Sequence, residues 1–286
     1  MTAPAPVRIG RRRGHTERTE EQYRRRMIRG AVYHTSRQVH EELTIVVQRF
    51  PVRHEPRDTD RAFVLVHGIG VSSRYFQPLA AELAQRGTVY LVDLPGYGAA
   101  PDPRRDVTIA EHAGVLASLL RRAGLDDAVL VGHSWGSQVV SALAARHPSV
   151  ASRIVLMAPT LEPGVRTFWR ATGSLLLDGF REPPRVWIIA LSDYLIRCGL
   201  PYLLRQTPHM LRDAIEARIG SLDARVLVVN GDRDPIVSPS WARELSALSE
   251  RVEFREVHGP HVIMHTDPVM IAEHIGAWLD DETVPA

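Results

Sequence analysis

From residue 43 onward, short runs of consecutive apolar residues alternate with longer segments whose apolar residues recur every three or four positions. The short runs predict β-strands, and the segments with helical spacing predict α-helices. The run Phe63-Val64-Leu65-Val66 is apolar at every position, which is typical of a strand buried on both faces of a parallel sheet. The predicted strands are residues 43–50, 61–67, 88–94, 127–132, 153–157, 224–230 and 252–257, and the predicted helices are 76–85, 108–122, 137–146, 240–248 and 267–279. This alternation predicts an α/β fold with a mostly parallel central sheet flanked by helices.

The alternation stops between residues 161 and 222, where the chain stays strongly apolar but has no obvious strand. Pro183-Pro184 can begin one helix that Gly199-Leu200-Pro201 ends, and Thr207-Pro208 can begin another that Gly220 ends. We therefore expect a helical insertion at 161–222 and a core made of residues 43–160 and 223–286.

Residues 1–42 have a different pattern. Thr19 can cap a helix in which Tyr23, Met27 and Ala31 recur at four-residue spacing among arginines. This predicts a basic N-terminal extension with a short amphipathic helix. Charge supports the division: all 35 basic residues are arginine, and residues 1–40 hold ten of them against three acids, although the whole chain has a net charge of only +2. A solvated extension, or a start codon assigned too far upstream, is favoured over binding to an anionic surface. Nucleic-acid binding through residues 8–29 is disfavoured.

Cysteine content and hydropathy bear on the compartment. The single cysteine, Cys198, excludes a disulfide within the chain and is compatible with a reducing compartment. No run of about eighteen apolar residues predicts a membrane span. The three arginines at 11–13 invite a twin-arginine export interpretation, but residues 14–21 are polar where an export signal needs an apolar region. We therefore expect a cytoplasmic protein.

The candidate nucleophile is Ser134, in Gly132-His133-Ser134-Trp135-Gly136 between a predicted strand and a predicted helix. A serine at the tip of such a tight turn projects from the sheet, and glycines flank it because side chains there would collide with neighbouring backbone. The adjacent helix start also offers free N–H groups to a developing oxyanion.

A serine hydroxyl needs a base to accept its proton and a third group to hold that base. Asp234 follows the predicted strand 224–230, and His261 follows the predicted strand 252–257. Loops at the carboxyl ends of parallel strands converge on one edge of the sheet, so these distant residues can meet there. Asp232 and Glu162 compete for the role of the acid, and His258 and His265 compete with His261 for the role of the base.

Further motifs add to these candidates. His67-Gly68-Ile69-Gly70 is similar to a His-Gly oxyanion loop, residues 93–98 and 231–237 are similar to a turn and an acid loop, and His261 stands seven residues before Pro268. With the order serine, acid, histidine, they make residues 43 to about 280 resemble the α/β-hydrolase family with a helical cap, here residues 161–222. The resemblance implies that Ser134, Asp234 and His261 are catalytic and that the backbone N–H groups of Ile69 and Trp135 bind the oxyanion. It also favours Asp234 over Asp232, and His261 over the other histidines.

The predicted function is a serine hydrolase that cleaves an ester or lactone of a small, mainly apolar molecule through an acyl-enzyme. A carbon-carbon bond hydrolase, a thioesterase or a prolyl aminopeptidase on the same scaffold stays open, as does a ligand-binding protein from another functional class. The histidines show no metal-ligand spacing and no Gly-rich phosphate loop follows a strand, so we expect no cofactor.

Overall fold

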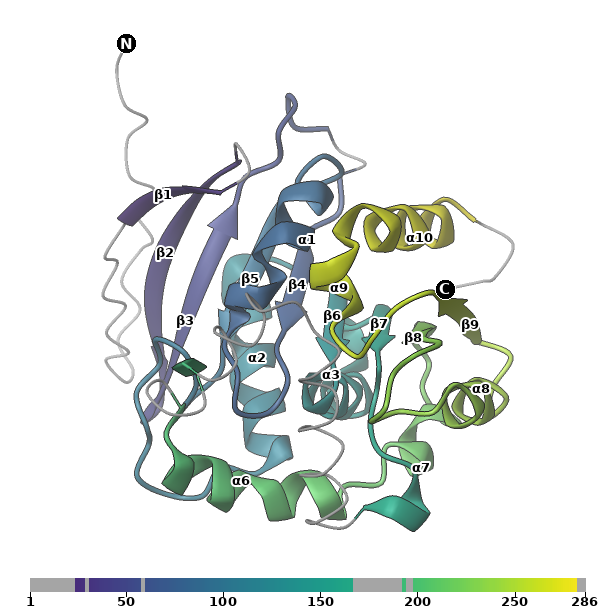
Figure 1. Ribbon diagram of the computed structural model, residues 1–286. Coiled ribbons are helices and arrows are strands. Elements are labelled where there is room, and N and C mark those ends of the chain that lie inside the picture. Colours follow the sequence, from purple (N-terminus) through teal and green to yellow (C-terminus); the bar gives the residue numbers. More distant parts are fainter. Residues whose placement is uncertain (1–23, 29–30, 58–59, 167–191, 194–197, 282–286) are drawn as a thin grey trace.

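The computed structural model describes residues 24–28, 31–57, 60–166, 192–193 and 198–281 (Figure 1). These residues form a sheet of nine strands in the order β1-β2-β3-β5-β4-β6-β7-β8-β9. The strands are β1 (Arg24–Ile28), β2 (Ala31–His40), β3 (Leu43–Phe50), β4 (Phe63–Val66), β5 (Val89–Asp93), β6 (Val129–His133), β7 (Arg153–Met157), β8 (Arg225–Gly231) and β9 (Val252–Val257). Strands β1 to β3 and the β3–β5 pair are antiparallel, whereas β5-β4-β6-β7-β8-β9 are parallel neighbours. The predicted mostly parallel α/β sheet is confirmed.

Two apolar layers cover the sheet, one on each face. The helices are η1 (Ser73–Phe76), α1 (Gln77–Leu83), α2 (Ile109–Ala123), α3 (Trp135–Arg146), η2 (Pro148–Val150), η3 (Pro163–Val165), α6 (Leu200–Arg212), α7 (Glu216–Ile219), α8 (Pro239–Ser246), α9 (Ile263–Thr266) and α10 (Pro268–Asp280). Side chains of α2, α3 and α8 pack in one buried cluster with Val64 and Val66, whereas those of α1, α9 and α10 pack in the other with Phe63 and Leu65. Successive residues of β4 therefore face opposite layers, which explains why its sequence is apolar at every position.

Local signals explain where the longest helix begins and ends. Thr108 and Glu111 form a reciprocal capping box at the start of α2, and Gly124 ends the helix in the left-handed conformation at φ 65°. Thr108 and Gly124 thus lie at or next to the predicted ends of this helix at residues 108 and 122.

The N-terminal segment differs from its prediction. The predicted helix is wrong over its described residues, because Arg24–Ile28 is strand β1 and Ala31 begins strand β2. Strand β2 pairs with β3, and the ring of Tyr33 stacks on that of Phe50 with centroids 4.8 Å apart. Ala31 and Tyr33 share one face of a strand, so both side chains are buried, which a helix would not allow. Pairing with a distant strand thus outweighs the local helical spacing, and residues 24–28 and 31–40 belong to the sheet instead of a separate extension. Residues 19–23 lie outside the described residues.

The described part of segment 161–222 contains η3, α6 and α7 and no strand. Cys198 is helical and Gly199 is not, so a helix boundary lies where 199–201 was predicted to end a helix. Gly199 also caps the start of α6, and Pro201 lies in its first turn, where a missing N–H costs nothing. The helix start predicted at Thr207-Pro208 is wrong, because α6 continues through Pro208, and the Thr207 hydroxyl donates to the Leu203 carbonyl there (2.8 Å). The helix start predicted at Pro183-Pro184 lies outside the described residues.

Helix α6 is attached to the core by specific side chains. The buried hydroxyl of Tyr202 donates to the Pro95 carbonyl (2.8 Å), and the Arg205 guanidinium contacts both oxygens of Asp102 at 2.7 Å.

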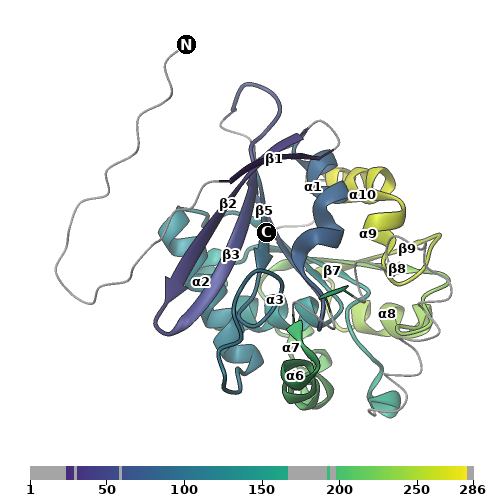
Figure 2. The same ribbon diagram turned by 60° about the vertical axis from the view of Figure 1, so that its left-hand side comes forward.

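In both views α6 and α7 lie together at one end of the molecule, with β2 and β3 along one side of the sheet and β8 and β9 along the other (Figures 1 and 2). Among the described helices, none has the length and apolar character needed to cross a membrane.

Candidate active site

Ser134 occupies the turn between β6 and α3. Its backbone has φ 54° and ψ −122°, a conformation that L-residues rarely adopt and that costs about 1–3 kcal/mol. Two backbone hydrogen bonds hold the turn: the Ser134 N–H donates to the Met157 carbonyl and the Ser137 N–H donates to the Ser134 carbonyl, both at 2.9 Å. The side chain is half-buried at the carboxyl end of β6. The structure therefore has the strained strand-to-helix turn that the sequence motif predicts.

The flanking glycines are required by close backbone approach. A Cβ on Gly132 would lie 2.6 Å from the Gly136 carbonyl oxygen, and a Cβ on Gly136 would lie 2.3 Å from the Val66 carbonyl oxygen. Both distances are shorter than any normal contact. The two glycines thus let the turn close tightly and let α3 pack against the end of β4.

His261 and Asp234 are hydrogen-bonded to each other. The Asp234 Oδ2 accepts from His261 Nδ1 at 2.7 Å, and its Oδ1 accepts from the N–H groups of Ile236 (2.7 Å) and Val237 (3.0 Å). The Asp234 side chain has no exposed surface and the His261 side chain is 5% exposed. Because the carboxylate accepts the proton of Nδ1, the other ring nitrogen of neutral His261 carries a lone pair that can accept a proton.

The other candidate acids and bases form different contacts or are exposed. Asp232 accepts from His258 Nδ1 (3.0 Å) and from the Gly259 N–H (2.9 Å), and the latter hydrogen bond lowers the pKa of the Asp232 carboxyl below its ordinary value. His265 Nδ1 lies 3.0 Å from the Tyr75 carbonyl oxygen, and Glu162 is exposed. The structure therefore brings together two candidate acid–base pairs, of which Asp234–His261 is buried and Asp232–His258 is exposed.

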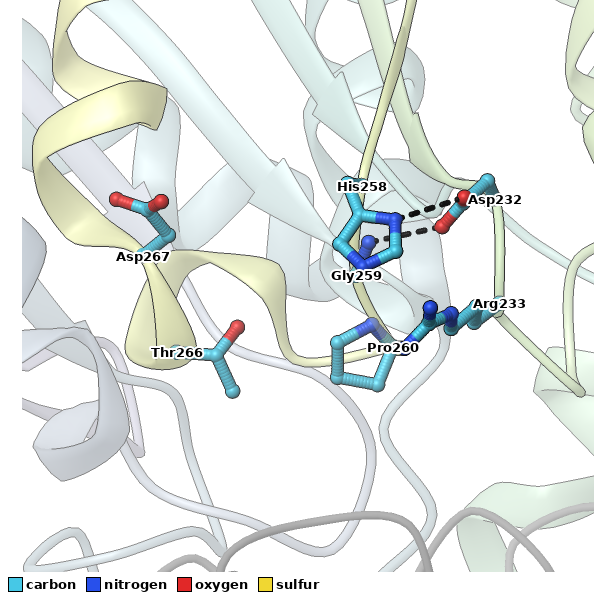
Figure 3. Close-up of a pocket in the computed structure, with 7 residues that line it drawn as sticks. All are labelled: Asp232, Arg233, His258, Gly259, Pro260, Thr266 and Asp267. Carbon is cyan, nitrogen blue, oxygen red and sulfur yellow. Dashed lines mark hydrogen bonds and ion pairs between the residues drawn. The ribbon is translucent and has the colours of Figure 1, made fainter.

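A surface pocket of about 760 Å³ lies beside the acid and histidine loops (Figure 3). It is lined by Asp232, Arg233, His258, Gly259, Pro260, Thr266 and Asp267, and by none of Ser134, Asp234 and His261. Asp232 is engaged by His258 and Gly259, and Asp267 caps α10 by accepting the Met270 N–H (3.1 Å). Since these carboxylates are already used within the protein, this pocket is not the candidate active site.

Ile69 and Trp135, the candidate oxyanion donors, are both buried. Trp135 is the first residue of α3, so its N–H has no acceptor within the helix. Ile69 follows β4 in a loop that lies close to the candidate nucleophile: a Cβ on Gly68 would lie 3.3 Å from the Ser134 Cβ. His67 holds the start of this loop: its Nδ1 donates to the Gly68 carbonyl (2.8 Å) and its Nε2 accepts the Leu94 N–H (3.1 Å). Burial lowers the pKa of His67, in keeping with this neutral form.

Two residues that the sequence pattern does not single out also hold the loop after β4. The Tyr75 hydroxyl accepts the Gly68 N–H at 2.8 Å. Asp193, from segment 161–222, accepts both the N–H (2.9 Å) and the hydroxyl (2.5 Å) of Ser72. No local sequence signal identifies either residue, because Asp193 acts across a long sequence separation and Tyr75 contacts Gly68 across a loop that has no repeating pattern. Among the described residues, no group of three or more His, Cys, Asp or Glu side chains could hold a metal ion.

A mostly parallel sheet whose strand ends carry a nucleophile turn, an acid and a histidine is the architecture of the α/β hydrolases. The family model described as alpha/beta hydrolase fold matches residues 61–185. The chain is 40% identical over 242 residues to a pimeloyl-(acyl-carrier protein) methyl ester esterase of Chromobacterium violaceum, with 74% of this chain and 93% of the relative covered. It is 34% identical over 239 residues to a 2-(acetamidomethylene)succinate hydrolase of Mesorhizobium japonicum, with 75% and 86% covered. The chain belongs to the alpha/beta hydrolase fold family.

Other similarities are partial or structural. Uncharacterized proteins of Mycobacterium bovis and Mycobacterium tuberculosis are 36% identical over 97 residues, and the match spans 34% of this chain and only 28% of their length. The crystal structure of an enol-lactonase from Burkholderia xenovorans superposes with a TM-score of 0.74 at 18% identity, covering 86% of this chain and all of that one. At this identity the likeness concerns the fold alone.

Proposed function

We propose that the protein is a serine hydrolase that cleaves an ester or lactone of a small, mainly apolar molecule. The observation that carries the proposal is the buried 2.7 Å hydrogen bond between His261 and Asp234, in loops that follow neighbouring parallel strands. The strained turn that presents Ser134 lies at the carboxyl end of the same sheet. This combination supplies a nucleophile, a base and a group that orients the base.

In the proposed reaction, Asp234 keeps the proton on Nδ1 of His261, so Nε2 accepts the Ser134 proton while Oγ attacks the carbonyl carbon. The negative charge that develops on the carbonyl oxygen is bound by the N–H groups of Ile69 and Trp135, each contributing about 3 kcal/mol to lowering the barrier. His261 then protonates the leaving alkoxide, which leaves an acyl group on Ser134. Water, deprotonated by His261, attacks this acyl-enzyme and releases the acid.

The choice of a C–O bond draws on the name of one similar protein, a methyl ester esterase that is 40% identical. The mainly apolar substrate is inferred from the apolar sequence of segment 161–222, which we propose to be the cap over the site. Hydrolysis of a carbon-carbon bond, a thioester or a prolyl amide is the alternative with the same residues. The proposal places the protein in the cytoplasm, where its single cysteine remains a thiol.

The test is a panel of chromogenic esters of graded acyl length, with a lactone, a thioester and a prolyl amide beside them. Wild type should hydrolyse at least one ester or lactone and be labelled by a fluorophosphonate. The Ser134→Ala variant should lose both activities, whereas Ser246→Ala, which removes a hydroxyl bonded only to its own helix, should keep them. Turnover by Ser134→Ala would refute the nucleophile. Labelling of the wild type without turnover of any ester or lactone would favour one of the other bonds, and ligand binding without labelling would favour a binding protein.

A further inference from the structure

A continuous chain of hydrogen bonds crosses the buried side of the candidate active site. The Gly68 N–H donates to the Tyr75 hydroxyl (2.8 Å), which lies 2.9 Å from Nδ1 of His133. The Nε2 of His133 lies 3.1 Å from the backbone carbonyl oxygen of His261. The side chains of Tyr75 and His133 are each 3% exposed, so water does not compete for these bonds.

Chemistry allows only one arrangement of protons along this chain. The Gly68 N–H can only donate and the His261 carbonyl can only accept, so Nε2 of His133 carries a proton. Burial, followed by the nearby His261 ring, holds the pKa of His133 well below its ordinary value, so the ring is neutral and Nδ1 can only accept. The Tyr75 hydroxyl therefore donates to Nδ1 and accepts from Gly68.

The ends of the chain lie at two parts of the proposed machinery. Gly68 precedes Ile69, the proposed oxyanion donor, and His261 is the proposed base. The middle of the chain is His133, the residue before Ser134. Gly68 and His261 lie in the loops after β4 and β9, whereas His133 is the last residue of β6. The pairing of β4 with β6 extends to Val66 and Gly132, and the side chains of Tyr75 and His133 add contacts among the three segments beyond it.

We propose that Tyr75 and His133 are positioning residues that hold the oxyanion loop and the backbone of His261 in place around Ser134. This inference rests on the proposed function. The neutral state of His133 has a further consequence, because its ring centroid lies 4.6 Å from that of His261. A cation on His133 would oppose the positive charge that His261 acquires when it accepts the Ser134 proton. Because this series of hydrogen bonds requires a neutral His133, it orients His261 without raising the energy of protonated His261.

The first test is Tyr75→Phe, which removes one hydroxyl and breaks two of the three bonds while keeping the ring. We expect kcat on the best ester, and the rate constant for fluorophosphonate labelling, to fall about 10- to 100-fold with KM changed less than about threefold, because misplacement affects the transition state most. The matched control is Tyr33→Phe, which removes the hydroxyl of a buried tyrosine in β2. This hydroxyl accepts from the Gln77 side chain of α1 (3.4 Å), and its loss should leave kcat unchanged.

The second test compares two changes at His133. Glutamine has an N–H that can reach the His261 carbonyl, whereas leucine fills similar space with no polar group. We expect His133→Gln to retain at least tenfold more kcat than His133→Leu, with both proteins folded by circular dichroism. Equal activity of these two variants, or a Tyr75→Phe variant as active as wild type, overturns the inference while leaving the proposed function intact. A wild type that neither hydrolyses esters nor is labelled overturns both.

Discussion

In an Asp234→Asn variant the side chain keeps its shape but can no longer accept three hydrogen bonds. Its remaining oxygen is held by the N–H groups of Ile236 and Val237, so the amide nitrogen must face Nδ1 of His261. Two N–H groups cannot hydrogen-bond to each other, and His261 therefore moves its proton from Nδ1 to Nε2. In that tautomer the nitrogen meant to accept the Ser134 proton has no lone pair.

The expected loss is large. Enzymes with this arrangement lose about 10⁴-fold in kcat when the acid becomes an amide, which corresponds to about 5 kcal/mol of transition-state stabilisation at about 1.4 kcal/mol for each factor of ten. Folding should change little, because the amide can still donate to Nδ1 and its oxygen still accepts the two backbone N–H groups. Activity and stability should thus separate in this variant.

The assay is ester hydrolysis under saturating substrate, with urea unfolding of the same samples. Asp232→Asn is the matched control, because Asp232 is in the same loop and bonds to a histidine, yet its side chain is 38% exposed and so is most of His258. We expect that control to keep kcat within about threefold, as exposed ion pairs contribute little. A larger loss in Asp232→Asn than in Asp234→Asn would refute the assignment of the acid.

Three other changes test the packing around the site. Gly136→Ala places a Cβ 2.3 Å from a backbone atom and should lower the free energy of unfolding by about 1–3 kcal/mol in urea titrations. The control Gly114→Ala, in α2, has no atom within 4 Å of the new Cβ and should raise the free energy of unfolding by about 0.5–1 kcal/mol. Equal effects of the two substitutions would contradict this reasoning. Burial lowers the pKa of His112 to about 3, so below pH 6.5 the unfolded chain binds a proton that the folded protein excludes. The contribution of His112 to the free energy of unfolding should therefore fall by about 2 kcal/mol between pH 7 and pH 5. Urea titrations at both pH values should show a smaller fall in the His112→Phe variant than in wild type. The same pH dependence in both proteins would contradict the low pKa of His112. Tyr202→Phe leaves the buried Pro95 carbonyl without its donor and should lower the free energy of unfolding by about 1–3 kcal/mol in the same measurement. An unchanged free energy of unfolding would contradict this prediction.

Strong local signals predicted most of the core. The strand at Phe63-Val64-Leu65-Val66 is apolar at every position because both faces of the sheet are covered, and Thr108 and Gly124 mark the ends of α2. The turn at Ser134 was also predictable, because a side chain at either of its two glycines would collide with neighbouring backbone, and both glycines stand in one short segment.

Other elements depended on contacts that no local pattern contains. The spacing of Met27 and Ala31 fits a helix, but pairing of β2 with β3 and the stacking of Tyr33 on Phe50 produce strands. Pro208 looks like a helix boundary, yet α6 includes it because the helix is held on the core by Tyr202 and Arg205.

The sequence by itself determined the alternation of strands and helices in residues 43–160 and 223–280, the glycine-flanked turn at Ser134, and a short set of candidate acids and bases. Residue type alone left both Asp232 and Asp234 as candidates, since both stand in one loop and have the same chemistry, and the family resemblance favoured Asp234. Only the tertiary structure shows that Asp234 is buried against His261 while Asp232 lies at the surface with His258. The proposed roles of Tyr75 and His133 likewise depend on the end of β6 meeting the loops after β4 and β9, and hydrogen bonds between such segments leave no periodic trace in the sequence.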